Sequence, residues 1–214
     1  MNDRALLLDM DGVVLDSMHY HVAAWMKALA EKGFNVKKEL LYLYEGALEP
    51  DVAVRLFSSQ GCKMDRQRFH AILKRQKEIF VTEYKGFVRP FPEIQDVIST
   101  IKANGVRLAL VTSSHKEILD AVLPEKLVCL FDEVITGDQV IRRKPHPDPY
   151  LQALKALALD RGTGATAVEN APSGIKSAKA AGLKTIAITT TLSPERLKEA
   201  DVVIEHHRQL LDMI

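Results

Sequence analysis

The stretch LLLDMDGVVLDS, Leu6–Ser17, places three leucines directly before two aspartates, Asp9 and Asp11. Such an apolar run predicts a buried strand, because strands covered on both faces are hydrophobic without interruption. Residues i and i+2 of a strand point to the same side, so the two carboxylates are expected to share a face at the strand's end. Gly12 then lets the chain turn away. Carboxylates this close repel each other, so we expect a cation between them or a proton on one of them.

Further apolar runs, rich in β-branched residues, alternate along the chain with segments of helical periodicity. They are Ala5–Met10, Val106–Thr112, Glu133–Thr136, Ala165–Val168, Thr185–Thr189 and Asp201–Ile204. This alternation predicts an α/β fold in which helices cover both faces of a mainly parallel sheet. Ligands of such sheets bind at the carboxyl ends of the strands.

One segment breaks the alternation. From Ser17 to about Lys85 the pattern is helical throughout, with Gly33 and Gly61 as stop signals. We therefore expect a helical subdomain inserted after the first strand, with residues 17–85 as its bounds.

Composition narrows the classes of partner. The 214 residues carry 29 basic and 28 acidic side chains, and the formal net charge of +1 favours neither nucleic acid nor a membrane surface as a partner. The first residues lack the layout of a signal peptide or a spanning segment, so a cytoplasmic protein is expected. No heptad pattern indicates a partner helix, and we expect a monomer or a weak homo-oligomer.

The two aspartates have a simpler interpretation that the spacing excludes. A calcium loop of the EF-hand type beginning at Asp9 would need an oxygen ligand, a glycine and a glutamate where the sequence has Val13, Val14 and Tyr20. A nucleophile beside an acid that can be protonated is instead what phosphoryl transfer through an aspartyl-phosphate requires.

Four motifs follow one another in the order found in the haloacid dehalogenase-type hydrolases: DMDGVVLDS, LALVTSS, RRKPHPDPY and TAVENAPSG. The chain resembles this family over nearly its whole length, within the subgroup of β-phosphoglucomutases and phosphoglycolate phosphatases. The resemblance implies a Rossmann-like parallel sheet core, residues 1–16 and 86–214, with an inserted all-helical cap at 17–85. It also implies a magnesium-dependent phosphatase for a small phosphorylated substrate, of the sugar phosphate, phosphoglycolate or pyrophosphate class.

The resemblance assigns roles to five residues. Asp9 would attack phosphorus, and Asp11 would protonate the leaving oxygen and later take a proton from water. Thr112 and Ser113 would bind a phosphate oxygen, and Lys144 would offset the charge of the nucleophile and the phosphoryl group. Taken singly, Thr112 is also typical of an ordinary strand and Lys144 of a solvated basic loop.

The resemblance likewise implies a magnesium site made of Asp9, the main-chain carbonyl of Asp11, Glu169 and Asn170. Most relatives carry two acids in the last motif, so Asn170 removes one negative charge. We hypothesise that Glu45, in the stretch LYEGALEP, completes the magnesium shell when the cap closes. The alternative is an ordinary exposed glutamate.

Two alternatives concern the cap and the outcome of the reaction. Sugar-phosphate mutases of the family resemble this chain at DSMHYHVAAW, where His21 and Trp25 lie on one helical face, and His21 is predicted to contact the active site. Those mutases carry an arginine for a second phosphate where this chain has residues 47–51 without one, which favours a hydrolase. A β-phosphoglucomutase-type mutase and a non-catalytic phosphate- or metal-binding regulatory module remain the alternatives.

Overall fold

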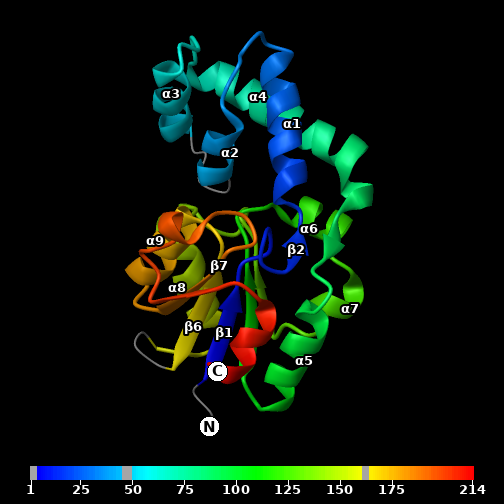
Figure 1. Cartoon of the computed structure of the whole chain (residues 1–214), viewed down its shortest axis with the longest axis vertical. Helices are drawn as coiled ribbons and strands as arrows, with labels where there is room; N and C mark the ends of the chain where they lie inside the picture. The colour runs from blue at the N-terminus through cyan, green and yellow to red at the C-terminus, as the bar shows by residue number, and fades with distance from the viewer. Residues whose placement is uncertain (1–3, 45–49, 161–163) are drawn as a thin grey trace.

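The computed structural model describes residues 4–44, 50–160 and 164–214. Six parallel strands form one sheet in the order β5-β4-β1-β6-β7-β8, with helices on both sides of it (Figure 1). These strands are β1 (Ala5–Leu8), β4 (Arg107–Val111), β5 (Glu133–Ile135), β6 (Ala165–Glu169), β7 (Lys184–Ile188) and β8 (Val202–Ile204). Each expected apolar run overlaps one of them and differs from it by a few residues at most at either end, so the predicted parallel α/β sheet is confirmed.

Four α-helices precede the second half of the sheet and lie beyond its carboxyl edge (Figure 1). They are α1 (Met18–Ala30), α2 (Lys38–Tyr44), α3 (Pro50–Ser59) and α4 (Arg66–Ile79). The other α-helices are α5 (Ile94–Ala103), α6 (Lys116–Val122), α7 (Glu125–Val128), α8 (Asp148–Ala156) and α9 (Pro172–Ala180). Shorter turns are the π-helix η1 (Phe80–Tyr84) and the 3-10 helices η2 (Lys85–Phe87), η3 (Pro194–Arg196) and η4 (His207–Asp212).

Strand β1 is buried on both faces, which explains its uninterrupted leucines. Leu6 and Leu8 belong to one hydrophobic cluster with α5, whereas Ala5 and Leu7 belong to another with α8. Each fully buried leucine contributes about 1.5–3 kcal/mol relative to an exposed one. The strand therefore holds the residues that follow it, beginning with Asp9, on a rigid support.

A short antiparallel ribbon joins the sheet to helices α1–α4. Its strands are β2 (Leu15–Asp16) and β3 (Arg89–Pro90), and the chain thus enters and leaves the helical segment at neighbouring positions. Among the described residues between 17 and 85, all regular elements are helical, as expected. The division into a core and a cap at these bounds remains a prediction.

Helices α1 and α4 pack together through aromatic side chains. The rings of Trp25 on α1 and Phe69 on α4 are stacked, with centroids 6.1 Å apart. Asp65 caps the start of α4 by accepting a hydrogen bond from the Arg68 main-chain N–H at 2.8 Å. The last turns of α4, which include Gln76, line a cavity at the carboxyl edge of the sheet.

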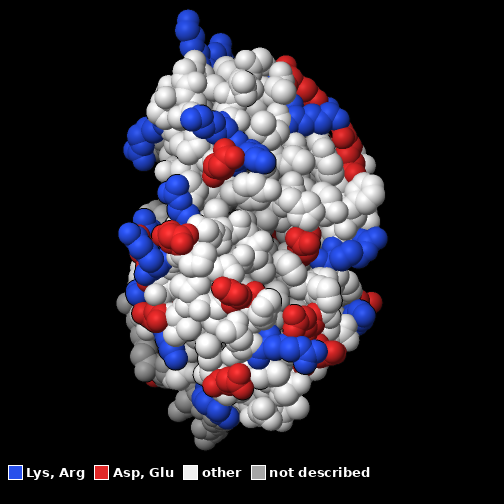
Figure 2. Space-filling view, viewed as in Figure 1, with Lys and Arg blue, Asp and Glu red and all other residues white. Residues whose placement is uncertain are grey.

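Charges of both signs are interspersed over the face shown in Figure 2, in keeping with the net charge of +1. Exposed ion pairs, such as Arg75 with Glu31 at 2.7 Å, connect α4 to the end of α1. Pairs of this kind each contribute about 0–1 kcal/mol, so packing rather than charge holds the helices together. None of the described helices combines the length and apolarity needed to cross a membrane.

Candidate active site

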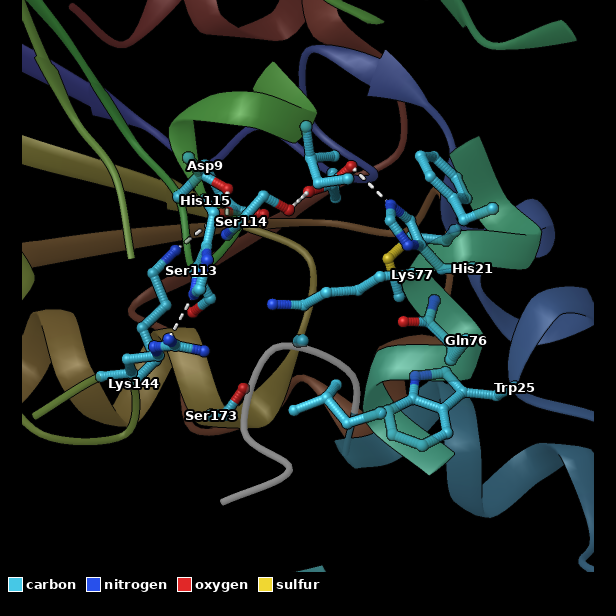
Figure 3. A pocket seen from close by; sticks show the side chains of 18 of the residues that line it. Asp9, His21, Trp25, Gln76, Lys77, Ser113, Ser114, His115, Lys144 and Ser173 are labelled. Atoms are coloured by element: carbon cyan, nitrogen blue, oxygen red, sulfur yellow. Dashed lines mark hydrogen bonds and ion pairs between the residues drawn. The ribbon is translucent and has the colours of Figure 1, made fainter. Parts of the chain in front are cut away.

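The carboxyl ends of three neighbouring strands meet at one cavity. Asp9 follows β1, Thr112 follows β4 and Glu169 ends β6, and β1 lies between the other two strands. The cavity has a volume of about 520 Å³, and α1 and α4 complete its walls (Figure 3). The sheet order thus brings together side chains that are up to 160 positions apart in the sequence (169 − 9).

Lys144 links two buried carboxylates at the base of this cavity. Its Nζ donates hydrogen bonds to Asp9 Oδ1 at 2.6 Å, to Glu169 Oε1 at 2.7 Å and to the Val111 carbonyl at 2.8 Å. The Tyr150 hydroxyl donates a second hydrogen bond to Glu169 Oε1 at 2.6 Å. All three ammonium protons are therefore used, and the side chain of Lys144 is fixed against Asp9.

Burial raises the pKa of Asp9 to about 7, and the charges of Glu169 and Asp11 add to this effect, while Lys144 opposes it. For Lys144, burial alone would lower the pKa, but the attraction of Asp9 and Glu169 outweighs it and raises the pKa. Asp9 and Glu169 share the single ammonium of Lys144, and the charge of Asp11 also acts on Asp9, so acidic groups exceed basic ones at the base of the cavity. A further cation would relieve this excess.

Asp11 is bound by a different set of partners. Its Oδ1 accepts a hydrogen bond from the Ser17 hydroxyl at 2.6 Å and lies 3.2 Å from His21 Nε2, and its Oδ2 accepts one from the Ser114 hydroxyl at 2.9 Å. Burial would raise the pKa of Asp11, but the His21 ring and the two hydroxyls outweigh burial and lower it. His21 thus lies in the same cavity as Asp11, and its role there remains a prediction. The ring itself is stacked on Phe80 at 3.9 Å.

Two hydroxyl residues follow β4 at the edge of the cavity. Thr112 is held by its main-chain N–H, which donates to the Ile135 carbonyl at 2.9 Å, and its hydroxyl accepts from the Ser114 main-chain N–H at 3.0 Å. The Ser113 hydroxyl is buried and has no hydrogen-bond partner among the described residues. Buried hydroxyls are normally satisfied, so Ser113 is suited to bind an oxygen atom of a ligand.

Asn170 lies at the same edge and keeps one oxygen available. Its Nδ2 donates to the Thr191 hydroxyl at 2.8 Å, which leaves Oδ1 as an acceptor. A β-carbon on Gly12 would come within 2.0 Å of Asn170 Nδ2, so only glycine at position 12 allows this placement. The sequence predicts Asn170 as a metal ligand, and this geometry is compatible with that role.

The donor set fits a magnesium ion that retains other ligands. No three His, Cys, Asp or Glu side chains among the described residues converge as a metal cage. Magnesium is usually held by one or two carboxylates together with waters and substrate phosphates. Asp9, the main-chain carbonyl of Asp11 and Asn170 could supply such a partial set, whereas Glu169 Oε1 is committed to Lys144. Glu45 lies outside the described residues.

The structure brings together most of the residues predicted from the sequence. The residues that line one cavity are Asp9, Asp11, His21, Thr112, Ser113, Lys144, Glu169 and Asn170. Sequence reasoning missed Ser17 and Ser114 as partners of Asp11, and Tyr150 as a partner of Glu169. Tyr150 ends the quoted motif RRKPHPDPY, so a buried hydroxyl near Lys144 could have been considered.

A family model described as haloacid dehalogenase-like hydrolase matches residues 6–188 of the chain, which include all four motifs. The chain belongs to the haloacid dehalogenase-like hydrolases. The resemblance seen in the sequence and the predicted fold class are thereby confirmed.

The chain is similar to proteins named as phosphatases and to one named as a mutase. A candidate pyrophosphatase, PpaX, of Caldanaerobacter subterraneus subsp. tengcongensis is 26% identical, covering 100% of this chain and 96% of its own length. Hexitol phosphatase A of Escherichia coli is 27% identical over 98% of this chain and 94% of its own. A solved candidate β-phosphoglucomutase of Bacteroides vulgatus superposes with a TM-score of 0.80 at 28% identity, over 98% of this chain and 86% of its own.

Proposed function

We propose that this haloacid dehalogenase-like hydrolase is a magnesium-dependent phosphatase that acts on small phosphorylated compounds. The observation that carries the proposal is the buried contact of Lys144 with Asp9 and Glu169, in the same cavity as the Ser113 hydroxyl, which has no partner among the described residues. This arrangement provides a fixed carboxylate nucleophile, a cation beside it and a donor for a phosphate oxygen. The phosphatase and pyrophosphatase names among the relatives support the same reaction class.

The reaction proceeds in two steps. In the first, a carboxylate oxygen of Asp9 forms a bond to phosphorus, the bond to the leaving oxygen breaks, and that oxygen receives a proton from Asp11. In the second, water attacks the aspartyl-phosphate, Asp11 takes a proton from the water, and Asp9 is regenerated as phosphate leaves. His21 Nε2 is 3.2 Å from Asp11, close enough to supply the proton that Asp11 delivers. General acid–base help of this kind gives about 10²–10⁴-fold acceleration.

Magnesium would supply charge neutralisation for the phosphate oxygens and for Asp9. Asp9, the Asp11 main-chain carbonyl and Asn170 would hold it, and Lys144 keeps Asp9 in position from the other side. Ser113 and Thr112 orient the phosphate toward Asp9.

Helices α1–α4 act as a cap over this site. They supply Trp25, Gln76 and Lys77 to the cavity, and the ribbon β2–β3 is the connection about which they would move. A helical cap that closes on the sheet excludes macromolecules and bulk water, so the substrates are small.

Phosphate release tests this proposal. The wild-type protein, Asp9→Asn and the exposed control Asp96→Asn would be assayed with hexitol phosphates, hexose phosphates, phosphoglycolate and pyrophosphate, each with magnesium or with EDTA. We expect magnesium-dependent release that is lost in Asp9→Asn and kept in Asp96→Asn. Equal release by wild type and Asp9→Asn would contradict the proposal.

A mutase is the second candidate, because the Bacteroides vulgatus structure is named for β-phosphoglucomutase and is 28% identical. A mutase passes the phosphoryl group from Asp9 to a sugar hydroxyl rather than to water. It predicts conversion of β-glucose 1-phosphate to glucose 6-phosphate that depends on a sugar bisphosphate primer. Conversion without net phosphate release would favour the mutase over the phosphatase.

A further inference from the structure

Beyond the strand ends, the cavity wall combines apolar side chains with cations and hydrogen-bond donors. Among the described residues that line it, the only acids are Asp9, Asp11 and Glu169, and all three belong to the reaction centre. The charged side chains of the remaining wall are Lys77, from α4, and Arg143, from the loop before Lys144. The wall therefore carries positive charge without an acid of its own.

Lys77 extends from α4 into the cavity, toward the side on which Ser113 and His115 lie (Figure 3). Among the residues whose side chains the structure describes, its ammonium has no hydrogen-bond or ion-pair partner, although most other basic groups near the site have one. Burial lowers the pKa of Lys77, and the neighbouring charge of Arg143 lowers it further. Glu117 and Asp138 act on Lys77 in the opposite sense, but neither lines the cavity. An anion in the cavity would therefore stabilise this ammonium.

Arg143 is held at the same wall by neutral partners. Its Nη2 donates to His115 Nε2, and its Nε donates to the Gly137 carbonyl at 3.2 Å. Burial and then the charges of Lys77 and Arg143 lower the pKa of His115, so the imidazole stays neutral and can accept from Arg143. A guanidinium has five N–H donors, so the Nη1 donors are left for a ligand. No carboxylate within the described residues forms an ion pair with Arg143.

Two further donors of the wall are buried without a partner. Trp25 is 1% exposed and Gln76 is 3% exposed, yet Trp25 Nε1 and Gln76 Nε2 form no hydrogen bond among the described residues. Both residues line the cavity beside Lys77 (Figure 3). Native structures rarely leave buried donors unpaired, and such donors point to an acceptor atom that a ligand supplies.

We propose that Lys77 and Arg143, with Gln76 and Trp25 as additional donors, form a second anion subsite, so that the preferred substrate carries a carboxylate or a second phosphate besides the phosphate attacked by Asp9. This inference rests on the proposed phosphatase function and narrows its substrate class. A neutral sugar presents hydroxyl donors as well as acceptors, whereas Lys77 and Arg143, the charged groups of this wall, can only donate. An anionic group needs only donors and cations, which is what the wall provides.

Matched substrate pairs test the subsite. In the first pair, phosphoglycolate carries a carboxylate where ethylene glycol monophosphate carries a hydroxymethyl group. In the second pair, 1,3-propanediol bisphosphate carries a second phosphate that 1,3-propanediol monophosphate lacks. With magnesium present, we expect kcat/KM to be about tenfold or more higher for the anionic member of at least one pair. The pair that shows the preference identifies the carboxylate or the phosphate as the second group.

Variants at Lys77 connect the preference to the wall. Lys77→Met should abolish most of the preference, chiefly through a higher KM for the anionic substrate, while kcat/KM for the neutral partner changes by less than about threefold. Lys77→Arg should restore part of the preference. Lys74→Met is the control, because Lys74 lies on the same helix but is exposed and outside this cavity, and it should leave both values unchanged.

The outcomes separate the subsite from the function on which it rests. Equal kcat/KM within both pairs, with hydrolysis that still requires Asp9, would overturn the subsite and leave the phosphatase intact. A Lys77→Met variant that loses activity equally on anionic and neutral substrates would also overturn it, because that result indicates a role in folding or in the common phosphate site. Phosphate release independent of Asp9 would overturn both proposals.

Discussion

Lys144 donates hydrogen bonds to both Asp9 and Glu169, so the position of the Asp9 carboxylate depends on groups deeper in the protein. Breaking a buried ion pair by removing one partner costs about 3–5 kcal/mol, because the remaining charge is left uncompensated. Tyr150 belongs to this network through its hydrogen bond to Glu169 and its ring, whose centroid is 5.2 Å from Lys144 Nζ. We therefore expect substitution of Tyr150, which holds Glu169 and Lys144, to affect the site as strongly as substitution of residues that line the cavity.

Tyr150→Phe tests this dependence at a single atom. The substitution keeps the buried ring and removes a hydroxyl that donates to a charged acceptor, so unfolding should become easier by about 1.5–3 kcal/mol. Equilibrium unfolding in urea measures this, and kcat should fall more than KM changes. Tyr84→Phe is the control, because the Tyr84 ring is stacked on Tyr20 and its hydroxyl bonds to none of the described residues. If Tyr150→Phe were as stable as wild type, Lys144 alone would hold Glu169.

At the scale of single residues, the sequence allows prediction of site residues that follow strands, but not of those that lie on helices. Asp9 and Glu169 each follow an apolar run, and parallel strands place such ends at one edge, so their proximity agrees with the roles that the family resemblance implies. Lys77 could not be predicted, because a lysine on an amphipathic helix is usually a solvated residue. Its place in the cavity depends on how α4 packs on α1, and the residue pattern does not define that packing.

Helix α9 begins so close to β6 that one of its glycines touches the site. A β-carbon on Gly174 would come within 2.0 Å of Glu169 Oε1. In a helix interior, Ala is more favourable than Gly by about 1 kcal/mol, so Gly174→Ala should stabilise the protein if space were available. We expect the opposite: lower stability and lower phosphatase activity, because Glu169 must shift away from Lys144.

Gly86→Ala provides the control for this contact, since nothing lies within 4 Å of a β-carbon at position 86. Thermal unfolding of both variants should separate the effect of crowding from that of helix propensity. A Gly174→Ala variant as stable and active as wild type would show that Glu169 can move without consequence.

The edge strand β8 is anchored by a carboxylate whose ionisation depends on pH. A hydrogen bond from Lys179 and one from the Thr185 main-chain N–H lower the pKa of Asp201 to about 2. The folded-state pKa lies below the unfolded value of about 3.9, so the ionised carboxylate stabilises the fold above that pH. This contribution is lost as pH falls from about 4 through 2.

Acid unfolding measures the contribution of Asp201. Asp201→Asn should have a flatter dependence of thermal stability on pH between about 4 and 2 than wild type. The exposed Asp96→Asn variant should follow wild type over the same interval. Identical profiles for wild type and Asp201→Asn would show that the hydrogen bonds of Asp201 do not stabilise the protein in solution.

At the element scale the parallel strands could be predicted and the ribbon β2–β3 could not. Strands of the sheet are apolar runs because both of their faces are covered, which gives a sequence signal. Strands β2 and β3 have two residues each, too few for any periodicity, and they pair only because the helical segment returns to its starting point. The pairing of β2 with β3 therefore depends on the tertiary structure and leaves no signal in the local sequence.

The hydrophobic interior continues from the sheet into the helical segment. Leu6 and Leu8 of β1 belong to the same cluster as Val22 and Trp25 of α1 and Phe57 of α3. Parts that share one core lose their packing together, whereas parts joined only by a linker unfold separately. Any movement of helices α1–α4 about the ribbon β2–β3 must therefore keep this cluster buried.

We accordingly expect the helical segment and the sheet to unfold in one cooperative transition. Trp25 is the single tryptophan of the chain and lies on α1, so its fluorescence reports on the helical segment, whereas far-UV circular dichroism reports on the whole fold. The urea midpoints of the two signals should coincide. Asp65→Ala, which removes the cap of α4, should lower stability by about 1 kcal/mol and shift both midpoints equally. If the fluorescence midpoint alone moved to lower urea, the helices would form an independent folding unit.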